Sequence, residues 1–436
     1  MREKVSVFWF RRDLRLDDNT GLYNALKGSH PVLPIFIFDT EILHSLPEND
    51  ARVTFIYDSL QEMRTKLKEH YQSSIGVYVG KPLDIFKTLL NQYDVQNVYT
   101  NRDYEPYVQK RDSEIAQALK LSNIEFKTSK DQVIFEKNQV VKDNGEPYVV
   151  YTPYMRKWKQ KLKTNEPVLV YDSGSLLNGM IKHKKLPDPY LEELGFKRSK
   201  IKVPAYEISS SFINSYEKTR NFPAIEKGTS KLGPHLRFGT VSIRQVILKT
   251  LNAQNETFLN ELIWREFFMQ ILWHFPHTVH KAFKPKYDRI PWRNNEMEFE
   301  KWKKGETGYP LVDAGMRELN ATGFMHNRVR MLVASFLCKH LLIDWRWGEA
   351  YFASKLLDFE LSSNIGNWQW AAGSGVDAAP YFRIFNPLTQ VDKFDQQIEY
   401  INKWVPELQE LTYPLMMVDH KMARERCLKV YKEALV

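Results

Sequence analysis

Hydrophobic and polar positions in the first part of the chain alternate between two periods. Short apolar runs, typical of buried strands, cover residues 5–10, 31–38, 75–79 and 97–100. Longer segments with helical spacing lie between them, including 51–70 and 84–93. Strands that alternate with helices predict a parallel sheet. We therefore expect a Rossmann-like parallel α/β domain over residues 1–130.

The pattern changes twice after this domain. Between residues 131 and 204, glycine and proline interrupt every regular period, which predicts a long interdomain linker. From 205 to 436, apolar positions return at helical spacing, as in 258–275, 311–319, 328–342 and 350–361. The fold expected is thus an α/β domain, a linker and an all-helical C-terminal domain, with enough chain to bury a large cofactor.

Composition excludes several classes of protein. The chain of 436 residues has only two cysteines, Cys338 and Cys427, too few for a disulfide framework or a four-cysteine metal site. A reducing compartment, the cytoplasm, is expected. We find no signal-peptide pattern and no membrane-spanning run, so no membrane partner is expected. Three evenly spaced histidines follow residue 273, but Pro276 interrupts their helix and no metal site is predicted.

The net charge of +9 is unevenly distributed. Residues 1–130 carry equal numbers of acidic and basic side chains, so the whole excess lies downstream. Basic surfaces attract polyanions, which makes nucleic acid a reasonable partner for the helical part. A solvated, mildly basic surface explains the charge equally well. The dense cluster Arg11–Arg15, after the first strand, is expected to form ion pairs that close a turn.

Aromatic residues gather in the helical part, where nine of the eleven tryptophans lie beyond residue 260. Trp292, Trp345 and Trp368 occupy separate segments, and several indoles leading away from one site can pass electrons one at a time. Trp368 belongs to the polar-aromatic run 364–370, which continues into the sequence DAAPYFRIFNP at 377–387. These features indicate redox photochemistry.

With TGYPLVD at 307–313 and MHNRVRM at 325–331, these motifs resemble the photolyase and cryptochrome family. The resemblance covers nearly the whole chain and is greatest to the class I cyclobutane pyrimidine dimer photolyases. It implies an FAD-binding helical domain. The sheet is not the expected flavin site, because it lacks the G-x-G-x-x-G fingerprint.

Two sets of residues are expected to hold FAD. Small residues before Pro234 let backbone N–H groups and hydroxyls face a phosphate, although a turn that only caps a helix would look the same. The resemblance implies that the diphosphate contacts Tyr216, Thr229, Ser230, Lys231, Leu232 and Gly233. It implies that the flavin ring and ribose contact Arg330, Asp358, Glu360 and Asn364. Asn364 would lie near ring nitrogen N5, and Glu360 stands where relatives usually carry aspartate.

A third set is expected to bind damaged DNA. Glu261, Trp264 and Arg265 fall within one helical turn and can face one pocket. The resemblance makes Glu261 the acid that hydrogen-bonds a dimer carbonyl, and Trp264 and Trp370 the apolar walls. The remaining substrate and DNA contacts implied are Arg220, Arg265, Asn327, Arg328, Met331 and Arg383.

The function expected from this resemblance is light-driven repair of cyclobutane pyrimidine dimers in DNA by electron transfer from reduced FAD, a carbon–carbon lyase reaction. Trp368, Trp345 and Trp292 would re-reduce oxidised flavin, in that order from flavin to surface. A cryptochrome-type blue-light photoreceptor is the alternative, disfavoured because the chain ends soon after the helical domain. The sequence does not identify a second, antenna chromophore. A deazaflavin, another flavin and an empty antenna pocket are the alternatives. We expect a monomer.

Overall fold

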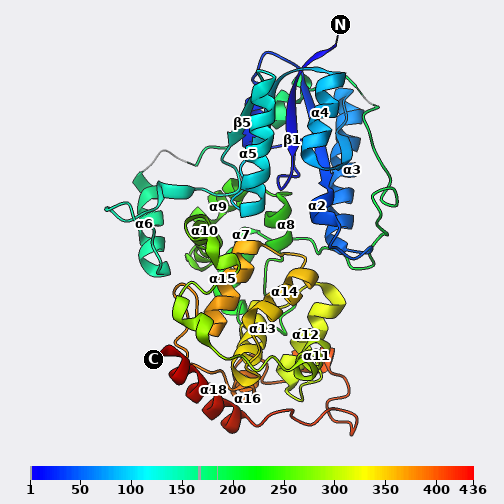
Figure 1. Cartoon of the computed structure of the whole chain (residues 1–436). Helices are drawn as coiled ribbons and strands as arrows, with labels where there is room; N and C mark the ends of the chain where they lie inside the picture. The colour runs from blue at the N-terminus through cyan, green and yellow to red at the C-terminus, as the bar shows by residue number, and fades with distance from the viewer. Residues whose placement is uncertain (1, 165–167, 184) are drawn as a thin grey trace. The chain divides into compact units, whose positions relative to one another are not determined.

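The computed structural model describes residues 2–164, 168–183 and 185–436 (Figure 1). The chain divides into two compact units. The first comprises residues 1–136, 162–205 and 232–249, and the second comprises 137–161, 206–231 and 250–436. Residues of the expected linker are thus shared between both units. Domain boundaries at 130 and 204 remain a prediction.

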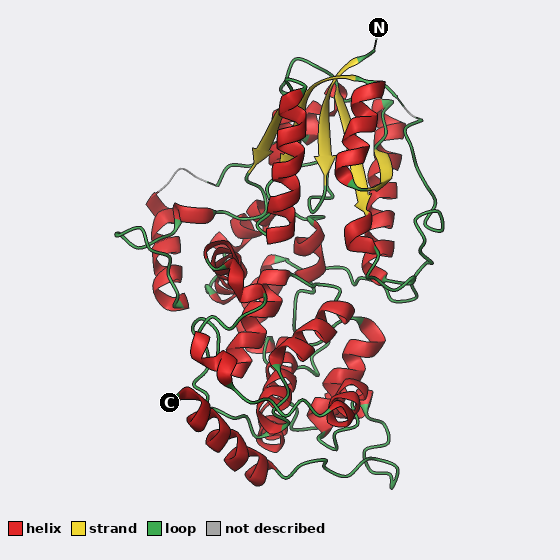
Figure 2. Cartoon of the chain, viewed as in Figure 1, coloured by secondary structure: helices red, strands yellow, loops and turns green. Residues whose placement is uncertain are grey.

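The first unit contains a five-stranded, fully parallel sheet with the order β3-β2-β1-β4-β5 (Figure 2). The strands are β1 Lys4–Phe10, β2 Val32–Asp39, β3 Gly76–Gly80, β4 Asp94–Asn101 and β5 Glu125–Ser129. The first four confirm the expected strands and the α/β fold class. Strand β5 was not expected, because this edge strand has only one large apolar residue, Phe126, and no buried position.

Helices cover both faces of this sheet because its central strands are buried on both sides. Along β1, Phe8 and Phe10 belong to a core shared with α1 and α3, whereas Val7 and Trp9 belong to a second core shared with α4 and α5. The helices are α1 Thr20–Leu26, α2 Thr40–Leu43, α3 Ala51–Tyr71, α4 Pro82–Gln92, α5 Pro106–Leu121, α8 Gly233–Phe238 and α9 Ile243–Leu251.

The second unit is helical throughout its regular structure, as expected. Its elements are α6 Tyr151–Thr164, α7 Ser210–Thr219, α10 Thr257–His274, α11 Glu296–Lys304, α12 Pro310–Thr322, α13 Asn327–Ser335, a π-helix Phe336–His340, α14 Trp345–Lys355, α15 Leu361–Ala372, α16 Pro387–Phe394, α17 Glu399–Trp404 and α18 His420–Leu435. At the close crossing of α10 and α15, a β-carbon on Gly366 would lie 2.2 Å from Cδ1 of Phe268, so a larger residue cannot fit.

The structure refines three of the expected segments. The segment 328–342 is helical as far as His340, as expected, but it changes from an α-helix to a π-helix at Phe336. The helix expected over 350–361 ends at Lys355, and a loop follows. Leu356 and Leu357 of this loop are buried, so the apolar positions in the sequence continue past the end of the helix. Part of the expected linker forms α6 despite Pro153. Proline is tolerated there because it stands in the first turn, where backbone N–H groups have no partner within the helix.

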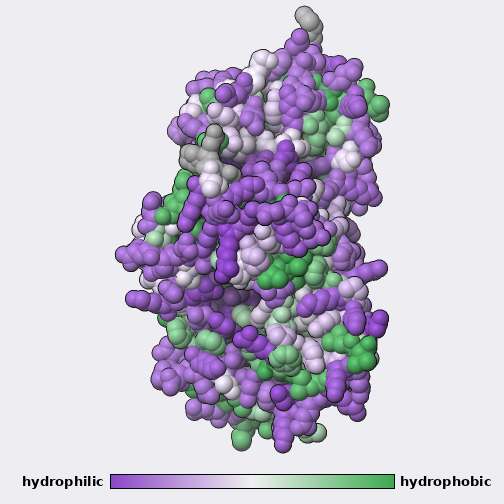
Figure 3. All heavy atoms as spheres, turned by 90° about the vertical axis from the view of Figure 1, so that its left-hand side faces the viewer, coloured by the Kyte–Doolittle hydropathy of each residue, from purple (hydrophilic) through white to green (hydrophobic). Residues whose placement is uncertain are grey.

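Hydrophilic side chains cover most of the face shown in Figure 3, with smaller apolar areas between them. No helix in the described part of the chain is both long and apolar enough to cross a lipid bilayer.

Candidate functional site

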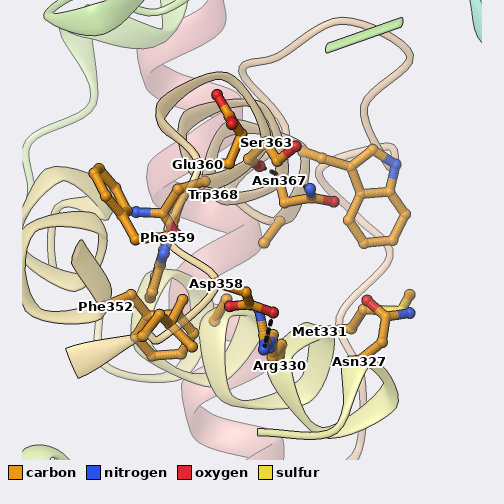
Figure 4. A pocket seen from close by; sticks show the side chains of 15 residues that line it. Asn327, Arg330, Met331, Phe352, Asp358, Phe359, Glu360, Ser363, Asn367 and Trp368 are labelled. Carbon is orange, nitrogen blue, oxygen red and sulfur yellow. Dashed lines mark hydrogen bonds and ion pairs between the residues drawn. The ribbon is translucent and has the colours of Figure 1, made fainter. Parts of the chain in front are cut away.

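A cavity in the second unit lies among α13, α15 and the loop 356–360. Phe352 of α14 also lines it. Figure 4 shows the side chains around it, with Asn327 and Met331 on one side of the view and Phe352 on the other. The cavity brings together eight residues that the sequence assigned to three different sets, for the flavin, the damaged DNA and the tryptophan relay: Asn327, Arg330, Met331, Asp358, Glu360, Asn364, Trp368 and Trp370.

Arg330 and Asp358 form a two-pronged ion pair at the cavity wall (Figure 4). Arg330 Nη1 and Nη2 donate to the two carboxylate oxygens at 3.1 and 2.9 Å, and Nε donates to the carbonyl of Met325 at 2.7 Å. The fork fixes the loop 356–360 against α13, since the planar guanidinium matches the carboxylate in both position and orientation.

Asn364 is oriented by a residue that the sequence did not reveal. Its Nδ2 donates to Oε1 of Glu349 at 2.8 Å and to the Glu349 carbonyl at 3.1 Å. Burial raises the pKa of the Glu349 carboxyl, and the hydrogen bond from Asn364 opposes that rise. Because its amide nitrogen is engaged, Asn364 keeps its oxygen to accept a hydrogen bond from a group in the cavity. No local motif marks Glu349, which belongs to the preceding helix.

Only one of the three relay tryptophans reaches the cavity. Trp368 lines it, and α14 packs closely on this indole because a β-carbon on Gly348 would lie 2.1 Å from Cη2 of Trp368. Trp345 is buried at the start of α14, and Trp292 is half-buried. Trp302 is fully buried, with its ring centroid 6.2 Å from that of Trp368. The order of electron transfer remains a prediction.

Arg220 and Glu261 form a second ion pair in this unit. Arg220 caps the C-terminus of α7, and its Nη1 donates to Oε1 of Glu261, on α10, at 2.5 Å. The guanidinium carbon lies 5.5 Å from the ring centroid of Tyr216, one turn earlier. Burial, helped by the charge of Glu261, raises the pKa of Tyr216 to about 12. Tyr216 therefore stays a neutral hydrogen-bonding group.

Two further arginines carry positive charge without a matching carboxylate. Arg328 Nη2 donates to Oδ1 of Asn221 at 2.5 Å, and Arg383 is exposed. Burial lowers the pKa of Arg328, and repulsion from Arg220 and Arg383 adds to this effect. Among the residues that the structure describes, neither Arg328 nor Arg383 forms an ion pair. This concentration of cations is suited to phosphate groups.

The expected apolar walls come from different helices. Trp370, on α15, lines the cavity. Trp264 and Arg265 lie on α10 with Glu261, outside the cavity lining. The Trp264 indole is half-buried and packs 5.5 Å, between ring centroids, from Phe268.

The expected diphosphate turn crosses the boundary between the units. Thr229, Ser230 and Lys231 belong to the second unit, whereas Leu232 and Gly233 belong to the first, at the start of α8. Lys231 has a left-handed backbone, with φ of 52°, and its Nζ lies 3.4 Å from the ring centroid of Phe324. Burial lowers the pKa of Lys231.

The residues present fit FAD. Within the described ranges Lys231 makes no ion pair, and a partly buried cation without a carboxylate is suited to a phosphate. The cavity offers aromatic walls from Phe352 and Trp368, together with the Asn364 amide and the neutralised Arg330–Asp358 pair. That combination suits a flat heterocycle with polar edges.

Family comparisons agree with this arrangement. Residues 258–412 match the family model described as the FAD binding domain of DNA photolyase, and residues 6–170 match the model described as DNA photolyase. A deoxyribodipyrimidine photo-lyase from Halobacterium salinarum is 36% identical, with 99% of each chain covered.

Solved structures show the same fold. The chain is similar to a bacterial class III photolyase from Agrobacterium tumefaciens, with a TM-score of 0.88 and 33% identity over 100% of this chain and 98% of the other. It is similar to an archaeal photolyase from Sulfolobus tokodaii with two FAD molecules, with a TM-score of 0.81 and 33% identity over 98% and 100%. A Synechocystis cryptochrome has a TM-score of 0.87 and 26% identity over 99% of each chain. Assignment to class I remains a prediction. The chain belongs to the photolyase and cryptochrome family, and its helical unit carries the family's FAD-binding domain.

Proposed function

We propose that this protein uses reduced FAD and light to split cyclobutane pyrimidine dimers in DNA. One observation carries the proposal: a single cavity is lined both by the residues expected to hold the flavin, Arg330, Asp358 and Asn364, and by residues expected to meet the dimer. The latter are Asn327, Met331 and Trp370. The full-length relatives named deoxyribodipyrimidine photo-lyase support it.

Bound in its reduced form, FAD supplies light-driven donation of one electron. The protein holds and shields it. Lys231 would neutralise diphosphate charge, the Arg330–Asp358 pair would hold the flavin without adding net charge, and the Asn364 oxygen would be available to accept a hydrogen bond from it. Glu349 fixes which end of that amide faces the ring.

The Arg220–Glu261 pair would recognise the dimer. A thymine edge offers an N–H donor between carbonyl acceptors, and the pair offers a carboxylate oxygen beside guanidinium N–H groups. Glu261 accepts the imide N–H while Arg220 donates to a carbonyl, where negative charge develops after electron arrival. The expectation that Glu261 itself contacts the dimer carbonyl remains a prediction.

The dimer must leave the duplex to reach the cavity, a step that general knowledge of base-flipping enzymes already assigns to photolyases. Arg328 and Arg383 would hold the flanking phosphates, and Trp264 and Trp370 would pack on the extruded bases. Trp368, Trp345 and Trp292 would re-reduce oxidised flavin between repair cycles. The two cysteines are both free and buried, which fits a monomer working in the reducing cytoplasm.

A cryptochrome-type photoreceptor is the second candidate, favoured by the similarity to the Synechocystis protein. One experiment separates the two. The reduced holoprotein is illuminated with DNA that contains a defined thymine dimer, and restored thymines are quantified against a dark control. If the protein repairs DNA, thymine should be recovered only in the light, with many dimers split per protein molecule. No recovery by a fully reduced, DNA-binding sample would reject the repair function. Identification of a second chromophore needs mass analysis of what the purified protein releases.

A further inference from the structure

One face of the Trp264 indole is already occupied. Tyr151, the first residue of α6, lies flat against it, with ring centroids 3.6 Å apart and planes inclined by only 7°. No third ring fits between two rings in van der Waals contact. Any base that packs on Trp264 must therefore use the rest of the indole surface, and Tyr151 is the backing of that wall.

Hydrogen bonds from two separate segments hold Tyr151 in this position. Its hydroxyl donates to the carbonyl of Asn260 at 2.7 Å, one turn before Trp264 on α10. Its backbone N–H donates to Oδ2 of Asp377 at 3.2 Å, where a carboxylate also suits the helix N-terminus. Burial raises the pKa of Tyr151, so the hydroxyl remains a donor. The ring cannot turn away from the indole without losing the bond to Asn260.

The rest of α6 contacts α10 at other points. Tyr154 packs on Phe267 with 5.1 Å between centroids, and Trp158 Nε1 donates to Oε1 of Glu266 at 2.5 Å. Phe267 in turn meets the Trp264 indole edge-on at 5.6 Å. These contacts fix α6 along α10, but within this helix the parallel stack on Trp264 comes from Tyr151. The neighbouring Tyr154 therefore offers a matched control for general damage to this packing.

We propose that Tyr151 is a positioning residue for substrate recognition. It sets the plane of the Trp264 wall on which a damaged base packs, and through Asp377 it joins this wall to the segment that carries Arg383. The inference rests on the proposed function, since Trp264 must be a substrate wall for its orientation to matter. In the opposite arrangement, Tyr151 fills the place of a substrate base and leaves when DNA binds. Removal of the Tyr151 ring would then strengthen, rather than weaken, the preference for DNA that contains a dimer.

The test compares holoproteins that carry Tyr151→Leu, Tyr151→Phe, Tyr154→Leu or Trp264→Ala. In the dark and at one fixed salt concentration, the affinity for a duplex with one thymine dimer is divided by the affinity for the same undamaged duplex. Without its stacking partner the Trp264 indole can take other orientations, so Tyr151→Leu should lower this ratio about tenfold, which corresponds to about 1.4 kcal/mol. Tyr151→Phe keeps the stack and should lower the ratio about twofold, whereas Tyr154→Leu should leave it unchanged.

Bound flavin per chain and the thermal midpoint show whether each variant is folded. A Tyr151→Leu ratio equal to wild type, alongside a lowered ratio for Trp264→Ala, would overturn the positioning role and leave the proposed function intact. A raised ratio for Tyr151→Leu would overturn it in favour of a displaced placeholder. An unchanged ratio for Trp264→Ala would instead remove Trp264 as a substrate wall, and the inference with it. If Tyr151→Leu does not fold, a more than fivefold loss in Tyr151→Phe would also contradict the proposed stack.

Discussion

Each unit holds a group of three arginines, and the two groups differ in how many carboxylates they meet. In the first unit, Arg11, Arg12 and Arg15 each meet a carboxylate: Arg11 pairs with Asp112 at 2.7 Å and Arg15 with Asp131 at 2.6 Å. Arg12 pairs with both Asp103 and Glu105. The second group is Arg220, Arg328 and Arg383. Within the described part of the chain, these three arginines form a single ion pair, between Arg220 and Glu261.

The difference teaches how to interpret basic residues in a sequence. The dense cluster Arg11–Arg15 attracts attention, and it forms ion pairs as expected, but these pairs join the turn after β1 to carboxylates far along the chain rather than close the turn itself. The three arginines of the second unit are scattered over 163 positions by their numbering and look unremarkable, yet they lie close enough to repel one another. Cations matched by carboxylates hold a fold, whereas unmatched cations are available to a polyanion. Substitutions that break the ion pairs of the first group should therefore affect stability, whereas substitutions of the second group should affect function.

The largest effect is expected from Trp345→Phe in the second unit. Phenylalanine preserves much of the buried volume but is much harder to oxidise, so light-driven reduction of oxidised FAD should be almost abolished. Repair by chemically prereduced protein should survive. Transient absorption after a flash measures the first quantity and thymine recovery the second. A wild-type yield and lifetime in the variant would show that Trp345 is only packing.

Asp131→Ala should cause the next largest effect, on stability alone. Asp131 accepts from Arg15 and, at 2.9 Å, from Arg244, so its loss leaves two buried guanidiniums without this partner. We expect the free energy of unfolding to fall by about 3 kcal/mol, measured in urea. Burial opposes ionisation, but Arg15 and Arg244 hold the pKa of Asp131 well below its usual range. Its contribution is therefore present above about pH 4 and declines as the pH falls further, so the two proteins should converge in acid.

Arg328→Ala is the matched substitution in the second unit. Because no carboxylate depends on it, stability should change by less than about 1 kcal/mol. Affinity for dimer-containing DNA should fall about tenfold, and the slope of log affinity against log salt should become shallower by about one. Titrations at several salt concentrations check both. An unchanged salt slope would mean that Arg328 does not contact a phosphate.

The last effect appears only in alkaline solution and concerns Lys339, which is buried in the π-helix and donates to the carbonyl of Arg383 at 2.9 Å. Burial lowers its pKa to about 8. Between about pH 8 and pH 10 the unfolded chain holds this proton and the folded chain does not, so this group makes stability rise with pH. Relative to Lys339→Met, wild type should gain at most about 1.4 kcal/mol per pH unit in that window. A constant difference between the two proteins would contradict the shifted pKa.

Sequence reasoning succeeded where the relevant signal is local. The strands β1 to β4 each contain an apolar stretch, longest in β1 and β2, and the motif residues of α13 and α15 meet in one cavity because each segment carries its own helical period. It failed where partners are distant in the chain. Glu349 and Tyr151 carry no motif, and only the packing of α14 and α6 reveals that they orient Asn364 and Trp264.

The missing β-carbon of Gly348 has a consequence for the timing of electron transfer. With backbone rather than a side chain against it, the Trp368 indole is held on that side by the least flexible part of the protein. Tunnelling rates fall exponentially with the gap between donor and acceptor, so small differences in ring position from molecule to molecule would spread the rates widely. A clamped indole narrows that spread. The first hop from Trp368 should then follow a single exponential, and a population of Gly348→Ala molecules should show several.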